Sequence, residues 1–99
     1  MLVIVCYDVS IKSEGGPRRL RRVARACLDH GQRVQNSVFE CEVTPAAWAT
    51  LRARLLAEYE PSSDSLRFYF LGSGHRRRNA TEHHGTRPTP DVLEDPLIV

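Results

Sequence analysis

Residues 2–8, LVIVCYD, decide how this chain folds. Six apolar residues, rich in β-branched side chains, stand in a row directly before Asp8, and a short run of this kind predicts a central, buried strand. A single layer of helices can cover only one face of such a strand. The other face therefore predicts an interface with a second copy, and we expect a homodimer whose sheets face each other. The two alternating sets are Val3, Val5 and Tyr7, and Leu2, Ile4 and Cys6.

The residues after this strand predict the order β-α-β-β-α-β. Pro17 suits the first turn of a helix, apolar residues recur at helical spacing from Leu20 to Leu28, and Gly31 is expected to cap its end. Two such helices on one face of a four-stranded sheet make an α+β, ferredoxin-like sandwich. The remaining expected elements are strands at 33–35 and 38–43, a helix from Thr44-Pro45 to just before Pro61, and a strand at 66–71.

The last quarter of the chain differs in composition. Residues 72–90 are rich in Gly, Arg, His and Pro, which predicts an exposed excursion, and residues 97–99 predict a short terminal strand. We therefore expect a ferredoxin-like domain at residues 1–72 and a C-terminal extension at residues 73–99 that carries this extra strand.

The overall composition is that of a globular domain. Of the 99 residues, 41% are hydrophobic and 26% are charged, which argues against a disordered chain. The apolar run at residues 1–7 falls far short of the ~20 residues that span a bilayer. Three cysteines without a Cys-x-x-Cys pair favour a reduced, cytoplasmic compartment over a disulfide scaffold or a zinc ribbon.

Asp8 is the sharpest candidate for chemistry. Ligand and metal sites cluster at the ends of central strands, and a carboxylate beside apolar residues needs a cation or hydrogen-bond donors. One interpretation is structural, with Asp8 accepting backbone N–H groups of the following loop. The other is a metal site: Mg²⁺ often takes only one or two protein carboxylates, and a two-fold dimer would supply a second Asp8.

Arginines make the second candidate site. The net charge is only +2, but residues 1–35 carry seven basic and three acidic residues. Arginine suits phosphate because its planar fork donates two hydrogen bonds at once. The pattern predicts binding to a nucleic-acid backbone with weak sequence preference, whereas the simpler alternative is a solvated helix face. The candidate nucleic-acid-binding residues are Arg18, Arg19, Arg22, Arg25 and Arg33, with a weaker repeat at Arg76, Arg77 and Arg78.

No other group of residues in the sequence makes a convincing catalytic site. His75, His83 and His84 fall in the expected excursion and are interpreted as solvated loop residues rather than metal ligands. No residue stands out as a general base. The chain also lacks a P-loop, a Rossmann glycine pattern and a nucleophile elbow.

Two motifs together resemble the CRISPR-associated endoribonuclease 2 family: YDVS at residues 7–10 and GQRVQNSVFE at residues 31–40. The resemblance implies a ferredoxin-like homodimer in which a C-terminal strand crosses to the partner's sheet. It also implies that Asp8 is the Mg²⁺ ligand and catalytic residue of a phosphodiesterase acting on RNA or DNA. A partnership with the CRISPR integrase in spacer acquisition is implied as well.

Two functions therefore stay open at this point. In the first, Asp8 of both chains holds Mg²⁺ and the dimer cleaves a phosphodiester. In the second, the dimer is a non-catalytic DNA-binding scaffold that bridges integrase dimers, and Asp8 is structural. A ferredoxin-like ligand-binding regulator is a third reading, which explains neither the arginines nor the motifs.

Overall fold

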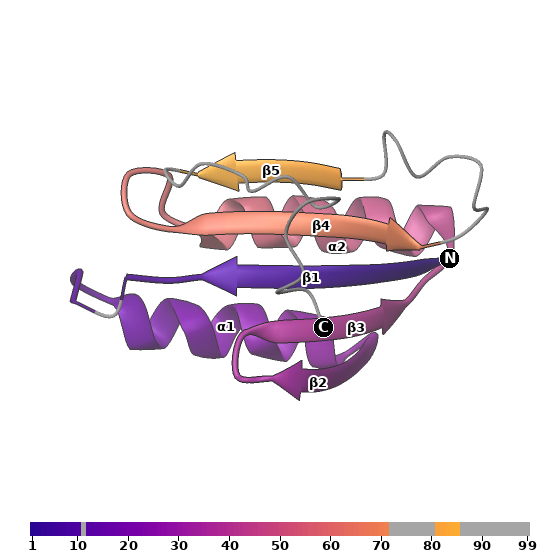
Figure 1. Ribbon diagram of the computed structural model, residues 1–99, viewed down its shortest axis with the longest axis horizontal. Coiled ribbons are helices and arrows are strands. Elements are labelled where there is room, and N and C mark those ends of the chain that lie inside the picture. Colours follow the sequence, from indigo (N-terminus) through magenta and orange to yellow (C-terminus); the bar gives the residue numbers. More distant parts are fainter. Residues whose placement is uncertain (11, 72–80, 86–99) are drawn as a thin grey trace, which may run out of the picture.

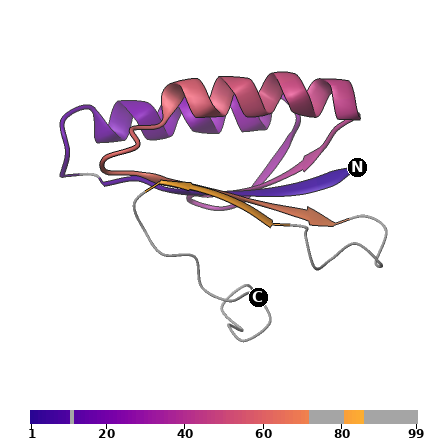
Figure 2. The same ribbon diagram turned by 90° about the horizontal axis from the view of Figure 1, so that it is seen from above.

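The computed structural model describes residues 1–10, 12–71 and 81–85 as a five-stranded antiparallel sheet covered on one face by two helices (Figures 1 and 2). The strand order is β2-β3-β1-β4-β5, so β1 lies in the centre. This confirms the α+β, ferredoxin-like expectation. The elements are β1 (Leu2–Asp8), α1 (Gly16–Leu28), β2 (Gly31–Gln35), β3 (Val38–Glu42), α2 (Pro45–Glu58), β4 (Ser65–Leu71) and β5 (Thr81–Gly85).

Strand β1 separates the two faces of the sheet. Its buried residues Val3, Val5 and Tyr7 alternate with the half-buried Leu2, Ile4 and Cys6. The first set points toward α1 and α2, and the second set lies on the face that carries no helix in the described part of the chain (Figure 2). This second face is called the helix-free face below.

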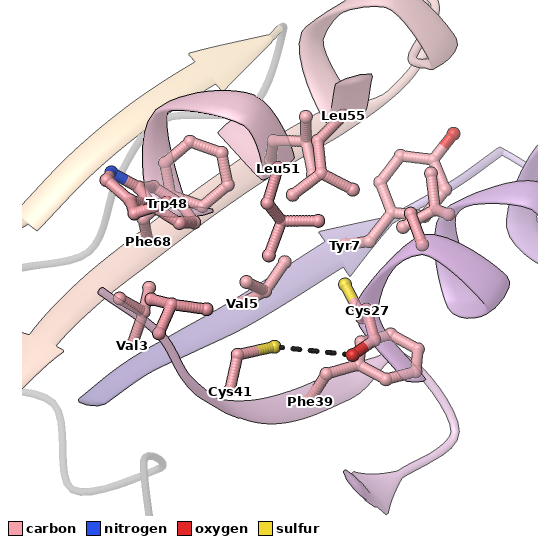
Figure 3. Close-up of a cluster of buried hydrophobic side chains, with 14 of the residues drawn as sticks. Val3, Val5, Tyr7, Cys27, Phe39, Cys41, Trp48, Leu51, Leu55 and Phe68 are labelled. Atoms are coloured by element: carbon pink, nitrogen blue, oxygen red, sulfur yellow. Dashed lines mark hydrogen bonds between the residues drawn. The ribbon is translucent and has the colours of Figure 1, made fainter. Parts of the chain in front are cut away.

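The core lies between the helices and β1, β3 and β4 (Figure 3). Trp48 of α2 packs edge-on against Phe68 and Phe70 of β4, with ring centroids 4.9 and 5.5 Å apart. Leu51 and Leu55, one and two turns further along α2, are fully buried. Each such side chain contributes roughly 1.5–3 kcal/mol by leaving water. The sheet and helices are thus one unit, and the end of β1 has a fixed position within it.

The helix starts follow from local chemistry. Gly15 precedes α1 with a φ of 77°, a left-handed conformation that glycine adopts without strain, and Pro17 stands in the first turn. Thr44 caps α2: its hydroxyl oxygen accepts a hydrogen bond from the Ala47 N–H at 3.1 Å. Both starts agree with the expectation from the sequence.

Gly31 has another role than the expected helix cap. It is the first residue of β2, whereas Asp29 caps α1. Its neighbour across the ladder is Cys41, and a Cβ at this position would lie 1.9 Å from the Glu40 carbonyl oxygen. A glycine is needed here because two backbones approach closely, not because the helix ends.

The expected excursion contains a strand. Residues 81–85 form β5, which pairs antiparallel with β4 of the same chain and is the sheet's outer strand beside it. His83 and His84 are therefore strand residues, and their interpretation as loop residues was wrong. The expected strand at residues 97–99 lies outside the described residues, as does the rest of the C-terminal extension except 81–85.

Candidate metal centre and nucleic-acid interface

Asp8 ends β1 as an exposed residue. It lies opposite Ser65 of β4, in the same alternating set as Leu2, Ile4 and Cys6, and so it is on the helix-free face. Among the described residues, no group of three or more His, Cys, Asp or Glu side chains could hold a metal ion. One chain therefore brings Asp8 to the surface without completing a metal cage around it.

A second carboxylate, Asp64, lies directly before β4 and is fully buried. Arg19 of α1 forms an ion pair with it, with Nε 2.8 Å and Nη2 3.1 Å from its two oxygens. The Tyr7 hydroxyl donates to the same carboxylate, as do the backbone N–H groups of Ser10 (3.3 Å) and Glu60 (3.0 Å). Asp64 thus joins β1, the loop after it, α1 and the turn before β4.

These donors determine the protonation of Asp64. Burial by itself raises the pKa of the carboxyl, but the hydrogen bonds from Arg19, Tyr7 and the two backbone N–H groups outweigh it and lower the pKa to about 2. Burial and the neighbouring Asp64 charge raise the pKa of the Tyr7 phenol above its ordinary value. Asp64 is consequently ionised, and Tyr7 is a neutral donor, across the physiological range.

Arg19 also donates hydrogen bonds to the loop that follows Asp8. Its guanidinium donates to the Glu14 carbonyl oxygen at 2.7 Å and to the Ser13 hydroxyl at 2.6 Å. Its side chain is only 15% exposed. Arg19 therefore holds Asp64 and the loop after Asp8 in place and exposes little of its side chain, while its contact with a nucleic-acid phosphate stays a prediction.

The other arginines of α1 form an exposed stripe. Arg18, Arg22 and Arg25 follow one another at spacings of four and three residues, and Arg21 lies beside them. Arg22 pairs with Glu58 of α2 at 2.8 Å. The stripe begins in the first turn of α1, at the end of the sheet where β1 ends in Asp8 (Figure 1). The start of the stripe, at Arg18, is thus at the same end of the molecule as Asp8.

The remaining predicted contacts are more dispersed. Arg33 is exposed on the outer strand β2, and its guanidinium carbon lies 5.3 Å from the centre of the Phe39 ring. Arg76, Arg77 and Arg78 lie outside the described residues.

The residues of β5 that face α2 make a polar cluster. Glu82 accepts from Arg52 Nε at 2.9 Å and also contacts His84 Nε2. The His84 ring packs near Phe68 and Tyr59. Because Glu82 and His84 lie on the helix side of the sheet, they are on the opposite face from Asp8. They therefore attach β5 to α2 and supply no general base to Asp8.

Sequence reasoning missed Asp64. The one indication in the sequence was its position: Asp64 directly precedes an apolar strand, whereas Asp8 directly follows one. Nothing in the sequence connects it to Tyr7 or Arg19, which are 57 and 45 positions away.

The fold agrees with what comparisons with known proteins find. The profile of the family described as CRISPR associated protein Cas2 matches residues 1–79. The chain belongs to the Cas2 family. A CRISPR-associated endoribonuclease Cas2 from Nitratidesulfovibrio vulgaris is 57% identical over 99 residues, which cover 100% of this chain and 94% of the relative. A CRISPR-associated endonuclease Cas2 from Halalkalibacterium halodurans is 49% identical over 98 residues, 99% of each chain.

Among solved structures, the chain is similar to Streptococcus pyogenes Cas2 in a crystal structure at pH 6.5. The two are 51% identical, with a TM-score of 0.69 over 79% of this chain and 94% of that chain. The Cas2 resemblance expected from residues 7–10 and 31–40 is thereby confirmed. No helix among the described residues is long and apolar enough to span a membrane.

Proposed function

We propose that this Cas2 chain works as a homodimer that binds a nucleic-acid backbone and cleaves it with Mg²⁺ held by Asp8 of both copies. The exposed carboxylate at the end of the central strand, on the helix-free face, carries the proposal. Relatives named endoribonuclease and endonuclease support the choice of reaction. The substrate class would be RNA or DNA, and the setting CRISPR adaptation in the cytoplasm, with the CRISPR integrase as partner.

The dimer explains the half-buried apolar residues of β1. Leu2, Ile4 and Cys6 would otherwise leave an apolar stripe in water along the middle of the sheet. Facing sheets would cover this stripe. They would also bring two Asp8 side chains into one site if both strands end on the same side.

The residues present fit a shared Mg²⁺. It binds oxygen ligands and commonly takes one or two carboxylates from the protein, with waters and substrate phosphate completing six positions. A single chain offers Asp8 alone, and two copies offer two carboxylates. When bound, Mg²⁺ would polarise the scissile phosphate and neutralise developing charge. Asp8 would hold the ion, the Tyr7–Asp64–Arg19 network would fix the backbone on either side of Asp8, and the α1 stripe would bind flanking phosphates.

Titration with Mn²⁺ as a spectroscopic substitute for Mg²⁺ tests this proposal. We expect one high-affinity ion per two chains, lost in Asp8→Asn. The control is Asp29→Asn, which removes an exposed carboxylate at the end of α1. One ion per chain, or unchanged binding in Asp8→Asn, would contradict a shared site.

A second candidate function is the non-catalytic scaffold. The observation that favours it is the exposed arginine stripe of α1, which requires neither a metal nor a general base to bind duplex DNA. In this case Asp8 would be structural, and the dimer would be a spacer and docking platform for the integrase.

Both candidates require the arginine stripe. The triple variant Arg18→Ala, Arg22→Ala, Arg25→Ala should weaken binding to duplex DNA and reduce the slope of log K against log salt by about 0.9 for each phosphate that it no longer neutralises. The measurement is a salt titration of fluorescence anisotropy with a DNA duplex. Arg54→Ala is the control, because Arg54 is on α2 and pairs with Asp29. An unchanged slope in the triple variant would exclude this stripe from the interface.

A further inference from the structure

Two polar side chains on the helix-free face have buried atoms without a hydrogen-bond partner. Arg67 of β4 lies opposite Cys6 of β1 and therefore shares the face of Asp8, and His83 of β5 lies opposite Arg67. Among the described residues, Arg67 Nε and His83 Nε2 are buried and have no partner. Buried polar groups are almost always hydrogen-bonded, so two such atoms side by side indicate a missing acceptor.

A contact with Tyr69 fixes the guanidinium of Arg67. Its Nη1 donates to the Tyr69 hydroxyl at 2.9 Å, and its guanidinium carbon lies 5.9 Å from the centre of that ring. No ion pair joins Arg67 to a carboxylate in the part of the chain that the structure describes. A guanidinium that is held in place in this way suits an anion that accepts two hydrogen bonds at once.

His83 adds a second donor. Burial, followed by the nearby charges of Arg67 and His84, lowers the pKa of its imidazole, so the ring is neutral at pH 7. A neutral imidazole carries one N–H, which Nε2 can donate. Both Arg67 and His83 are only half-buried as residues, so a ligand can reach them from the helix-free face. An acceptor between the two side chains would meet donors from both.

The two donors lie one step along the strands from Asp8. Asp8 is opposite Ser65 of β4, and Arg67 is two residues further along, so Asp8 and Arg67 are diagonal neighbours about 7–8 Å apart. Gly85, opposite Ser65 on β5, has no side chain to separate His83 from Asp8. A Cβ at Gly85 would lie 2.5 Å from the Ser65 Cα, so the two strands require glycine here. Arg67 and His83 therefore share one end of the helix-free face with Asp8.

The charge at this end of the molecule selects the acceptor. The arginine stripe of α1, which also begins at this end, predicts a nucleic-acid backbone as the partner (Figure 1). Each phosphate of that backbone has a negative charge and acceptor oxygens, so it can satisfy a guanidinium and an imidazole N–H together. A metal ion does not fit between these two groups, since Arg67 has no lone pair to offer.

We propose that Arg67 and His83 bind a phosphate of the nucleic-acid strand that passes Asp8. The inference rests on the proposed function and adds to it a substrate-binding site on β4 and β5. Arg67 would supply the charge and the bidentate fork, and His83 would donate one further hydrogen bond. Together with the α1 stripe, this site would place the strand across the end of β1, where Asp8 is exposed.

Arg67→Met and His83→Phe test this site through nucleic-acid affinity in EDTA, where no metal-dependent cleavage occurs. The probe is a fluorescein-labelled single-stranded RNA, measured by anisotropy over a range of salt. Arg67→Met should bind about tenfold more weakly and reduce the slope of log K against log salt by about 0.7, the effect of one single-strand phosphate contact. His83→Phe should bind about threefold more weakly with an unchanged slope, because the neutral ring carries no charge.

Three further variants serve as controls. Arg67→Lys keeps the charge and should keep the salt slope of wild type. Arg54→Met and His84→Phe make the matched changes on the helix side and should bind RNA like wild type. An equal loss of affinity in His84→Phe and His83→Phe would assign the effect to a weakened β5 and overturn the phosphate site.

The melting temperature of the free protein gives an independent measurement. Because the buried atoms lack partners, Arg67→Met and His83→Phe should leave the melting temperature unchanged or raise it. A lower melting temperature with unchanged RNA affinity would mean that the acceptor is a carboxylate of the protein, from residues 86–99 or from the partner subunit. This outcome would overturn the phosphate site.

The measurements separate this site from the nuclease proposal. If both variants bind RNA weakly and wild type shows no Mg²⁺-dependent cleavage, the phosphate site stands and the nuclease proposal alone fails. If wild type cleaves RNA and both variants keep its affinity and KM, the phosphate site alone fails. Where both proposals hold, Arg67→Met should raise KM more than it lowers kcat, because it removes a binding contact and leaves Asp8 in place.

Discussion

Asp8→Asn is expected to abolish metal-dependent cleavage while leaving the fold intact. Asparagine has nearly the same shape but carries no charge, and Asp8 is exposed, so little packing is lost. Removing an outer-shell partner of a metal typically costs 10–100-fold in affinity or activity, and a direct ligand should cost at least about a hundredfold. The measurement is the Mg²⁺-dependent cleavage rate of labelled single-stranded RNA and of duplex DNA, with melting temperatures recorded in parallel.

The control for this experiment is Asp29→Asn, which should cleave at the wild-type rate. Cleavage that persists in highly purified Asp8→Asn would assign the activity to another site or to a contaminant. The same variant separates the two candidate functions in a spacer-acquisition assay with the integrase. Full acquisition by Asp8→Asn would favour the scaffold, whereas its loss would show that acquisition depends on Asp8 itself.

A feature of this site could be predicted from the sequence where the residues that determine it are neighbours in the chain. The run at residues 2–7 is apolar in both alternating sets, and this alone predicts a central strand with Asp8 at its end. The role of Gly31 could not be predicted in the same way, because glycine suits both the end of a helix and a close approach of two backbones. Only the ladder to β3 shows that the second reason applies.

Strand β5 and Asp64 could not be predicted because their partners are distant in the chain. Residues 81–85, TEHHG, have weak β-propensity, and they form a strand beside β4 whose side chains contact α2. An unpaired buried carboxylate would be strongly unfavourable, so Asp64 is stable only because α1, β1 and the loop after β1 surround it with donors. Burial of this kind follows from topology and not from local pattern.

Asp64→Ala is expected to be among the most destabilising single substitutions in the chain. Removing one partner of a buried ion pair typically costs about 3–5 kcal/mol, since the remaining charge is left without compensation. Here Arg19, the Tyr7 hydroxyl and two backbone N–H groups would all lose their acceptor. Small domains have only about 5–15 kcal/mol of stability in total, so this loss is a large fraction. Urea denaturation at pH 7 measures it.

Glu58→Ala provides the control for this prediction. It breaks the Arg22–Glu58 pair, whose arginine side chain is 59% exposed, and such surface pairs contribute about 0–1 kcal/mol. A loss in Asp64→Ala no larger than that in Glu58→Ala would contradict the role of Asp64 in joining these elements.

The contribution of Asp64 should also depend on pH. Its pKa of about 2 is below the ordinary aspartate value, so the carboxylate stabilises the fold fully above the unfolded pKa near 4. This stabilisation is lost as the pH falls from about 4 toward 2, and a shift of this size corresponds to roughly 2–3 kcal/mol. The difference in unfolding free energy between wild type and Asp64→Asn should therefore be constant from pH 5 to 8 and shrink below pH 4. A difference that stays constant down to pH 2 would mean that the charge of Asp64 is not what holds β1, α1 and β4 together beside Asp8.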